Sequence, residues 1–283
     1  MSNKPFTVGS ALDDAASKLR SLGADARREA EILLSVVVER PRAALLANPG
    51  MPLDPGHAQK LQQWLERRLR GEPLAYLAGR KEFWSLDLEV DPRVLVPRPE
   101  TELLVEFALE VLPPDKHPRV LDLGTGSGAV ALAIAGERPD ARVVATDVSP
   151  EALAVACRNA ERLGLANVSF EVGHWYEPVG AMHFDLIVSN PPYVAENDPA
   201  LGGDGLRAEP RVALTSGPTG LEALQLIAAR AREHLRPHGW LAVEHGATQA
   251  DAVAALFSAQ GLSTIRSLRD LAGLPRATAG RHG

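Results

Sequence analysis

The sequence predicts an α/β protein in which a small helical N-terminal domain precedes a parallel, doubly wound sheet. From Arg119 onward, short apolar segments alternate with longer helical ones, as strands and helices do in such a sheet. The first of these segments runs directly into the glycine-rich turn GTGSG. Residues 8–71 instead repeat apolar side chains at the spacing of a helix.

The composition is that of a globular protein without membrane segments. The 283 residues are 45% hydrophobic and 23% charged. No apolar run approaches the roughly 18–20 residues of a membrane span, and MSNKPFTVGS lacks the apolar centre of a signal peptide. The single cysteine, Cys157, is typical of a reducing compartment, so we expect a cytoplasmic protein.

The net charge of −6 is unevenly distributed along the chain. Up to Ala75 there are 11 Lys and Arg against 9 Asp and Glu, and after it 19 against 27. Proteins that hold nucleic acid by its phosphates carry a basic face. We therefore expect no stable nucleic-acid binding by the acidic part, and the sequence indicates no metal site.

The helical domain is expected over residues 1–72, with helices in 11–23, 24–40 and 57–71. Residues 73–98 contain the alternating stretch FWSLDLEV, which predicts a hairpin linking the two domains.

The second domain is expected over residues 99–283. It begins with a helix near 98–112, whose first turn contains Pro99. Strands are predicted at 119–124, 141–147, 168–172, 184–190 and 239–246, with two more in 262–281. Helices are predicted between them, at 128–137, 150–164, 221–235 and 247–261. This alternation places helices on both faces of the sheet.

The turn after the first strand contains Gly124, Thr125, Gly126, Ser127 and Gly128. Glycines let a backbone turn tightly and approach a ligand without Cβ clashes. The turn lies at the carboxyl edge of the sheet, where open α/β folds bind ligands. The spacing also fits a dinucleotide fingerprint, so the turn alone does not identify the ligand.

Asp147 ends the next strand, about twenty residues after the turn. An acid at this place accepts hydrogen bonds from ribose hydroxyls, which predicts an adenosine-containing cofactor. NAD and S-adenosylmethionine both meet that condition. Asp122, just before the glycines, favours a cationic cofactor because its carboxylate can face an amino or sulfonium group.

The stretch SNPPY ends a predicted buried strand with a rigid polar corner. Asn190 supplies an acceptor oxygen. Pro191 and Pro192 fix two φ angles and remove two N–H donors, and this leaves carbonyls as the backbone polar groups. Tyr193 adds a flat ring. Two acceptors beside a stacking surface suit a planar NH2 group conjugated to a carbonyl or a ring.

Such a nitrogen is a poor nucleophile, and acceptors that bind its N–H bonds can orient it for attack on a methyl group. They also stabilise the positive charge that develops on it. Asn190, Pro191 and Tyr193 are therefore the predicted catalytic residues, and Pro192 joins them in substrate binding. His174 and His245 are candidate bases, although a histidine in such a position more often has a structural role than a catalytic one.

In this order, the DLGTGSG turn, Asp147 and the NPPY corner resemble the class I S-adenosylmethionine-dependent methyltransferases that act on planar nitrogens. The stretches EPLAYLAGRKEFW, VLVPRPETELLVE and EPRVALTSGPTGLEAL narrow the resemblance. Together with the helical N-terminal domain, they are similar to the HemK/PrmC family of peptide chain release factor glutamine methyltransferases. The resemblance covers nearly the whole chain.

The resemblance implies a seven-stranded, mostly parallel Rossmann-like sheet with an antiparallel final hairpin. It implies S-adenosylmethionine bound by residues 124–128, Asp147, Trp175 and Asn190, with Trp175 near the adenine. The substrate would be the N5 of the glutamine in the Gly-Gly-Gln motif of release factors 1 and 2. Residues 194–212 would form a mobile lip, and the helical domain would contact the protein substrate.

Alternative functions remain open at this point. One is methylation of a glutamine in a ribosomal protein. A second is an adenine-N6 or guanine-N2 nucleic-acid methyltransferase, which shares the corner but should bring a basic groove. A third is a non-catalytic cofactor-binding partner of the translation machinery.

Overall fold

The computed structural model describes residues 6–114, 116–203 and 205–283. It divides into two compact units, each with its own core. One unit extends to Gly79 and includes Pro199–Ala208, and the other contains Arg80–Asp198 and Glu209–Gly283. No helix in the described part of the chain is both long and apolar enough to cross a bilayer.

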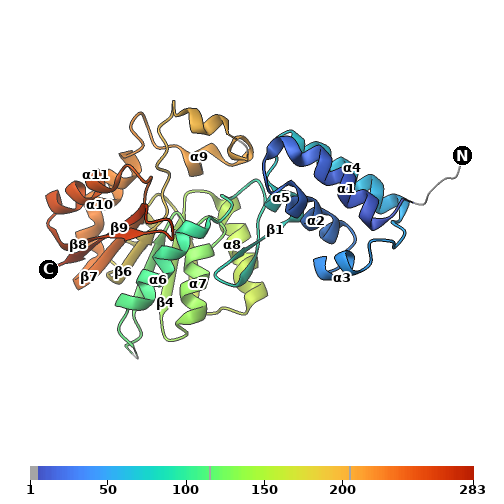
Figure 1. Cartoon of the computed structure of the whole chain (residues 1–283). Helices are drawn as coiled ribbons and strands as arrows, with labels where there is room; N and C mark the ends of the chain where they lie inside the picture. The colour runs from blue at the N-terminus through green and yellow to red at the C-terminus, as the bar shows by residue number, and fades with distance from the viewer. Residues whose placement is uncertain (1–5, 115, 204) are drawn as a thin grey trace, which may run out of the picture. The chain divides into compact units, whose positions relative to one another are not determined.

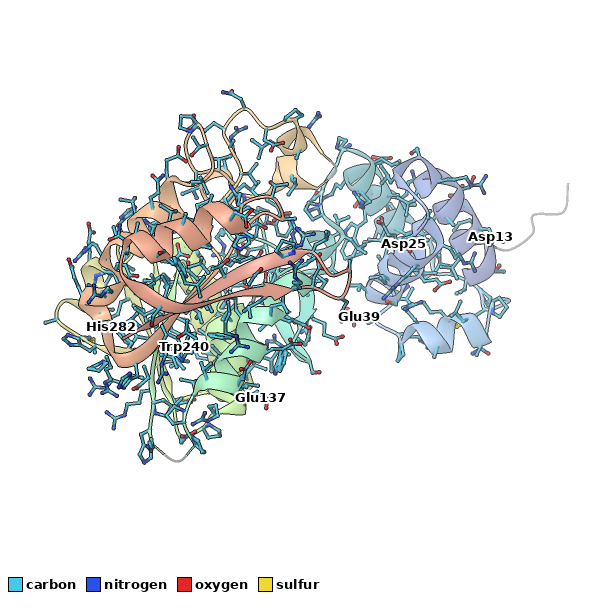
Figure 2. The ribbon with its side chains drawn as sticks, turned by 60° about the vertical axis from the view of Figure 1, so that its left-hand side comes forward. Asp13, Asp25, Glu39, Glu137, Trp240 and His282 are labelled. Atoms are coloured by element: carbon cyan, nitrogen blue, oxygen red, sulfur yellow. The ribbon has the colours of Figure 1, made fainter. Side chains whose placement is uncertain are left out.

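The first unit is helical. Its main helices are α1 (Val8–Leu19), α2 (Ala26–Val37), α3 (Arg42–Ala47), α4 (Pro55–Leu69) and α5 (Leu74–Ala78), with a 3-10 turn at Arg20–Leu22. Arg27 of α2 pairs with Asp13 of α1 at 2.6 Å; Asp13 is labelled in Figure 2. The expected domain of residues 1–72 starts outside the described residues, and the unit continues past 72 because α5 belongs to it. Helices as short as α3 and α5 carry too little periodicity to be read from sequence.

A short antiparallel hairpin opens the second unit. It pairs β1 (Arg80–Phe83) with β2 (Leu86–Glu89). Trp84 and Ser85 form its turn with φ values of 51° and 59°, so both occupy the left-handed region that tight two-residue hairpin turns require.

The main sheet has seven strands within the described residues, in the order β5-β4-β3-β6-β7-β9-β8. They are β3 (Arg119–Leu123), β4 (Arg142–Asp147), β5 (Val168–Val172), β6 (Phe184–Ser189), β7 (Leu235–Glu244), β8 (Leu262–Arg269) and β9 (Pro275–His282). Strands β3 to β7 pair in parallel, and β9 lies antiparallel between β7 and β8. The predicted fold class and final antiparallel hairpin are confirmed.

Helices cover both faces of this sheet (Figure 1). They are α6 (Glu102–Val111), α7 (Ala129–Glu137), α8 (Pro150–Leu163), α10 (Glu222–His234) and α11 (Ala250–Ala259). Successive residues of a strand point to opposite faces, so Leu186 joins the core under α6 and α7 while Ile187 joins the core under α10 and α11. Trp240, labelled in Figure 2, packs edge-on against Phe107 of α6 at 5.3 Å.

The connections carry the remaining short elements. These are η2 (Pro99–Thr101), η3 (Glu177–Val179), η4 (Pro199–Gly202), η5 (Leu206–Ala208) and α9 (Arg211–Leu214). The expected lip of residues 194–212 therefore contains η4 and η5, while residue 204 lies outside the described residues. β7 begins at Leu235, before the predicted start at 239, because Leu235 pairs with Phe184 of β6.

Candidate active site

The sheet order places a switch point between β3 and β6. The chain builds β3, β4 and β5 outward in one direction and then returns to the other side of β3 with β6. Loops after the two strands at such a point separate and leave a crevice at the carboxyl edge. A pocket of about 570 Å³ lies there. Its lining includes Pro92, Val94, Thr101, Asp122, Gly124, Thr125, Gly126, Ser127, Asp147, Ser149, Trp175, Asn190, Pro192 and Val212.

The glycine turn holds a conformation that needs glycine. Gly124, Gly126 and Gly128 have φ values of 72°, 56° and 85°. A Cβ on Gly128, which precedes α7, would lie 2.9 Å from a methyl carbon of Leu132. The N–H groups of Gly124 and Thr125 both donate to Thr146 O of β4, at 2.8 and 2.9 Å. The turn is therefore tied to the neighbouring strand.

Asp147 takes two backbone donors at once. Its Oδ2 accepts from Gly126 N and its Oδ1 from Ser149 N, each at 2.9 Å. Burial raises the pKa of Asp147, while these backbone N–H groups act to lower it. A carboxylate has about four acceptor positions, so both oxygens keep capacity for further donors such as ribose hydroxyls.

Asp122 is almost completely buried beneath the turn, with 2% of its surface exposed. Burial raises its pKa to about 7, and the nearby Asp147 adds to this, although Thr125 donates to Asp122 Oδ2 at 2.6 Å. No cation among the described residues is within ion-pair distance of Asp122. A carboxyl group in these surroundings gains most from a positively charged ligand.

Trp175 lies against the glycine turn. A Cβ built on Gly124 would be 3.4 Å from Trp175 Cζ3, and His174 contacts the indole edge-on at 5.4 Å. The indole Nε1 is buried, and the described residues offer it no hydrogen-bond acceptor. A buried N–H without an acceptor costs about 1–3 kcal/mol. This group is available to a ligand acceptor.

Asn190 follows β6, directly across the switch point from the glycine turn. Its side chain is half-buried, and Nδ2 donates to Thr101 Oγ1 at 3.1 Å. Thr101 is buried and ends η2, just before α6. Because Nδ2 is held, Oδ1 is the atom of the amide left to accept a hydrogen bond.

Of the other corner residues, one lines the pocket and two do not. Pro192 lines the pocket, whereas Pro191, Tyr193 and Gly128 lie outside its lining. Tyr193 donates from its hydroxyl to Glu244 Oε1 at 3.1 Å, and its pKa is raised by burial. The expected stacking surface is therefore not offered to the pocket by Tyr193 in this conformation.

The two histidine candidates have different surroundings. His245 is buried, with Nδ1 2.9 Å from Gly246 O and Nε2 2.8 Å from Thr278 Oγ1, and burial lowers its pKa. Both ring nitrogens make hydrogen bonds within the protein, so the role of His245 is structural. His174 lines the pocket.

Comparison with known proteins decides between the methyltransferase families. Residues 10–79 match the PrmC N-terminal domain model and residues 101–202 the Methyltransferase small domain model. The Release factor glutamine methyltransferase of Xylella fastidiosa (strain Temecula1) is 50% identical over 255 residues, which cover 90% of this chain and 93% of that protein. Its counterpart in Coxiella burnetii is 44% identical over 278 residues, covering 98% and 100%. This chain belongs to the release factor glutamine methyltransferase family.

A solved methyltransferase from Pyrococcus furiosus shares the fold of this family member. It has 23% identity and a TM-score of 0.54, and the match covers 78% of this chain and 99% of that one. The chain is a class I methyltransferase with S-adenosylmethionine as its cofactor.

The pocket fits that cofactor. The turn from Gly124 to Ser127 offers close backbone approach, Asp147 keeps acceptor capacity and Trp175 Nε1 lacks an acceptor among the described residues. Asp122 supplies a buried carboxyl group that has no ion-pair partner among the described residues. All the cofactor residues predicted from sequence except Gly128 thus line one pocket. Gly128 lies in the turn, directly before α7.

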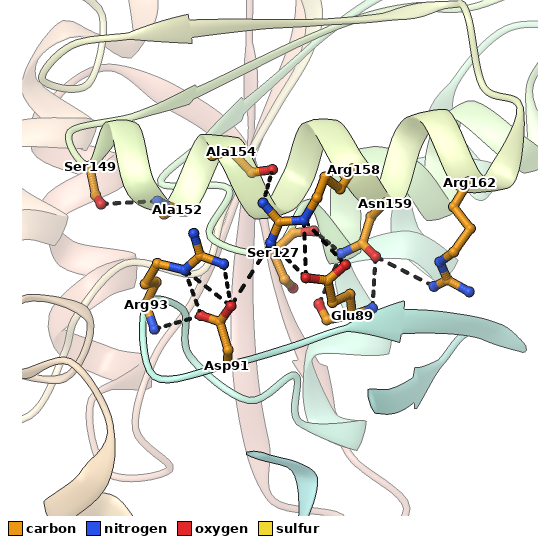
Figure 3. A network of polar contacts seen from close by, with 10 residues as sticks. All are labelled: Glu89, Asp91, Arg93, Ser127, Ser149, Ala152, Ala154, Arg158, Asn159 and Arg162. Carbon is orange, nitrogen blue, oxygen red and sulfur yellow. Dashed lines mark hydrogen bonds and ion pairs between the residues drawn. The ribbon is translucent and has the colours of Figure 1, made fainter. Parts of the chain in front are cut away.

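Three further residues of this family member were not predicted from sequence: Thr101, Glu244 and Asn159. Thr101 lies in the PRPETE segment. That segment is specific to the family, but its sequence did not indicate what Thr101 does. Glu244 ends β7, and the rule that singled out Asp147 as a strand-ending acid would also have found it. Asn159 is fully buried on α8 and links Glu89 to Ser127 within the polar network of Figure 3. A helical asparagine gives no signal of such contacts.

Proposed function

We propose that this chain transfers a methyl group to the side-chain amide nitrogen, N5, of the glutamine in the Gly-Gly-Gln motif of release factors 1 and 2. Family membership over nearly the full chain supports a release factor as substrate. The observation that carries the chemistry is Asn190 at the pocket, with Nδ2 held by Thr101 and Oδ1 left as an acceptor.

The corner recognises an amide NH2 group by its two donors. Asn190 Oδ1 accepts one N–H, and the carbonyl of Pro191 accepts the other. Because Pro191 and Pro192 lack N–H groups, the corner presents no competing backbone donor at those positions. A hydroxyl has one donor and a carboxylate has none, so neither could satisfy both acceptors as an amide NH2 group does.

S-adenosylmethionine supplies a methyl group on a sulfonium centre, which a nucleophile takes by in-line displacement. The glutamine nitrogen forms the new N–C bond as the methyl carbon leaves sulfur, and the nitrogen then loses one proton. Asn190 and Pro191 hold the nitrogen in the attacking direction and stabilise its developing positive charge. We assign no side chain among the described residues as a base, and the proton passes to solvent.

We also infer that the helical unit contributes to binding the body of the protein substrate, and that the reaction takes place in the cytoplasm, where release factors act. If the inference is correct, KM for a whole release factor is lower than for a short peptide containing Gly-Gly-Gln. Charge reversal at the exposed Arg70 then raises KM for the factor and leaves KM for the peptide unchanged.

The test is methyl transfer from radiolabelled S-adenosylmethionine to purified release factor 1 or 2. The matched control is the same factor with the Gly-Gly-Gln glutamine changed to alanine. Label on the intact factor alone supports the proposal. Label on both proteins rejects this glutamine as acceptor, and label on ribosomal protein or RNA but never on a factor rejects the release factor as substrate.

A further inference from the structure

Glu209 is a charged residue that is almost completely buried, although it lies in a connection between short elements. Only 4% of its surface is exposed. Its Oε2 accepts a hydrogen bond from Val96 N at 3.1 Å, and its Oε1 pairs with the guanidinium of Arg98. These partners lie 113 and 111 positions earlier in the chain. Because a buried carboxylate needs paired oxygens, the contacts of Glu209 hold two distant segments together.

Both of these segments contribute to the lining of the pocket. Before Arg98, the lining includes residues 92–95 and Pro97, and after Glu209 it includes Pro210, Val212 and Ala213. The stretch EPRVAL, which begins with Glu209, helped to identify the family but has no part in the methyl transfer described above. Its first residue therefore joins two parts of the pocket lining.

Arg98 connects Glu209 to the corner from Asn190 to Tyr193. Arg98 directly precedes η2, and its carbonyl oxygen accepts from Thr101 N at 3.1 Å. The hydroxyl oxygen of Thr101 in turn accepts from Asn190 Nδ2 at 3.1 Å. That contact turns the Asn190 amide so that Oδ1 is left for a substrate N–H. The position of Arg98 thus affects where the hydroxyl that holds Asn190 lies.

A second set of contacts reaches the corner from α9. Val194, the residue after the corner, donates its N–H to Leu214 O at 3.0 Å, and its carbonyl oxygen accepts from Ser216 N at 3.0 Å. Helix α9 lies between Glu209 and this pairing in the sequence and ends at Leu214. The corner is therefore connected to Glu209 on both sides, through Thr101 and through α9.

We propose that Glu209 is a positioning residue for methyl transfer. By joining the segment around Arg98 to α9, it holds the corner in the geometry in which Asn190 Oδ1 accepts the substrate amide. The proposal rests on the proposed function, because that function assigns this role to Asn190. Glu209 lies outside the pocket lining and acts only through its neighbours. A displacement of about 1 Å at the reacting groups can lower a rate about 100-fold, so a residue behind the lining can control kcat.

Asp185 provides a matched control with the same kind of contacts at the opposite end of β6. Its Oδ2 accepts from Arg119 N at 2.8 Å and from the guanidinium of Arg236 at 2.7 Å. A carboxylate thus again joins a backbone N–H and an arginine from distant segments. Asp185 lies near the start of β6, whereas Asn190 follows its end, and Asp185 does not line the pocket. Asp185→Asn should therefore lower stability without lowering kcat.

The experiment measures kcat for methyl transfer by the full chain to a release factor. We expect Glu209→Gln to lower kcat about 10- to 100-fold, because glutamine offers one acceptor oxygen to two donors and turns its NH2 group towards one of them. Arg98→Ala should lower kcat to a similar extent. Arg98→Lys keeps a cation for Glu209 and should retain more activity than Arg98→Ala.

Cofactor affinity distinguishes positioning of the corner from general damage to the pocket. The hydrogen bonds that hold the glycine turn and Asp147 do not involve Glu209 or Arg98. The Kd for S-adenosylmethionine, measured by calorimetry, should therefore stay within about twofold of wild type in these variants. A rise of Kd that equals the fall of kcat would overturn the inference.

The double variant Glu209→Gln with Arg98→Ala tests whether the two residues act through one contact. If they do, kcat of the double variant should lie within about threefold of Glu209→Gln alone. Losses that multiply would show that the two residues act separately, and this result would overturn the inference.

The remaining outcomes separate this inference from the proposed function. Wild-type kcat in both Glu209→Gln and Arg98→Ala would overturn the inference and leave the proposed function standing. An equal fall of kcat in Asp185→Asn would overturn it as well, because general destabilisation would then explain the loss. Absence of transfer to any release factor by the wild type would overturn both. If Glu209→Gln fails to fold, the more exposed Arg98 decides, and wild-type kcat in Arg98→Ala rejects the inference.

Discussion

Asn159 of α8 donates from Nδ2 to the carbonyl oxygen of Ser127, in the middle of the glycine turn, at 3.0 Å. The same Nδ2 donates to Glu89 O at 3.0 Å, and Oδ1 accepts from Glu89 N at 2.7 Å (Figure 3). One fully buried amide therefore joins α8, the end of the β1–β2 hairpin and the glycine turn. Pro92 and Val94, which follow Glu89 within five residues, line the pocket, and so does Ser127, so this amide connects two segments of the lining.

Asn159→Ala should lower both the free energy of unfolding and cofactor affinity. The substitution removes four hydrogen bonds, one of them a long contact from Arg162, and leaves the backbone groups of Glu89 and Ser127 without these partners, which costs about 3 kcal/mol of stability. Because the turn loses its support, the Kd for S-adenosylmethionine should rise about tenfold. Urea unfolding and calorimetric titration measure the two effects.

Asn167→Ala is the matched control. Asn167 also donates from Nδ2, to the carbonyls of Ala135, Arg138 and Ala141, but it lies outside the pocket lining. This variant should lose stability without loss of cofactor affinity. An equal rise of Kd in both variants would show that general destabilisation, and not support of the turn, weakens binding.

Asp147→Ala should weaken S-adenosylmethionine binding by about 1–3 kcal/mol through loss of charge-assisted hydrogen bonds. Part of the loss comes from Gly126 N, which then lacks its acceptor. Asp140→Ala is the control, because Asp140 pairs with Arg138 at 2.8 Å and does not line the pocket. An unchanged Kd in Asp147→Ala would reject the assignment of Asp147 to the ribose.

Asn190→Ala should lower kcat about 100- to 1000-fold, as expected when one preorganised acceptor is removed from a developing charge. The Asn190 side chain is half-buried and donates one hydrogen bond, to Thr101, so we expect the fold to persist. Transfer to a release factor under saturating substrates measures kcat, and circular dichroism checks folding. Asn48→Ala, at an exposed position of the helical unit, is the control. Normal turnover by Asn190→Ala would contradict the proposed amide-binding corner.

The pH dependence of stability should carry a contribution from Asp122. Its pKa is about 7 in the folded protein against an ordinary value of 3.8, so the folded state binds this proton more tightly than the unfolded state. The contribution to stability is complete below the unfolded pKa and is lost as the pH rises towards about 7.

Relative to Asp122→Asn, the wild type should therefore lose free energy of unfolding with rising pH, at up to about 1.4 kcal/mol per pH unit in that window. Urea unfolding of both proteins without cofactor at several pH values from about 4 to 8 measures the difference. Parallel stability curves would mean that Asp122 ionises normally in the folded protein.

The fold was readable from sequence where a pattern is local and repeated. Alternating apolar segments predicted the strands from β3 to β9, and the spacing of Gly124, Gly126 and Gly128 predicted the turn. Short elements such as α3 and α5 were missed, since five or six residues hold too little periodicity. The start of β7 at Leu235 depends on pairing of that residue with Phe184, which is a contact between distant segments.

The sequence by itself determined the fold class, the candidate cofactor residues at the ends of β3 and β4, and the polar corner from Asn190 to Tyr193. These are set by residue types within a few positions of one another, so their chemistry can be inferred without coordinates. Only the tertiary structure placed Thr101 in the pocket lining and brought Asn159 and Glu244 into hydrogen-bond contact with Ser127 and Tyr193. Their partners are distant in sequence, and the orientation of an amide or hydroxyl depends on which donors and acceptors the fold brings within hydrogen-bond distance.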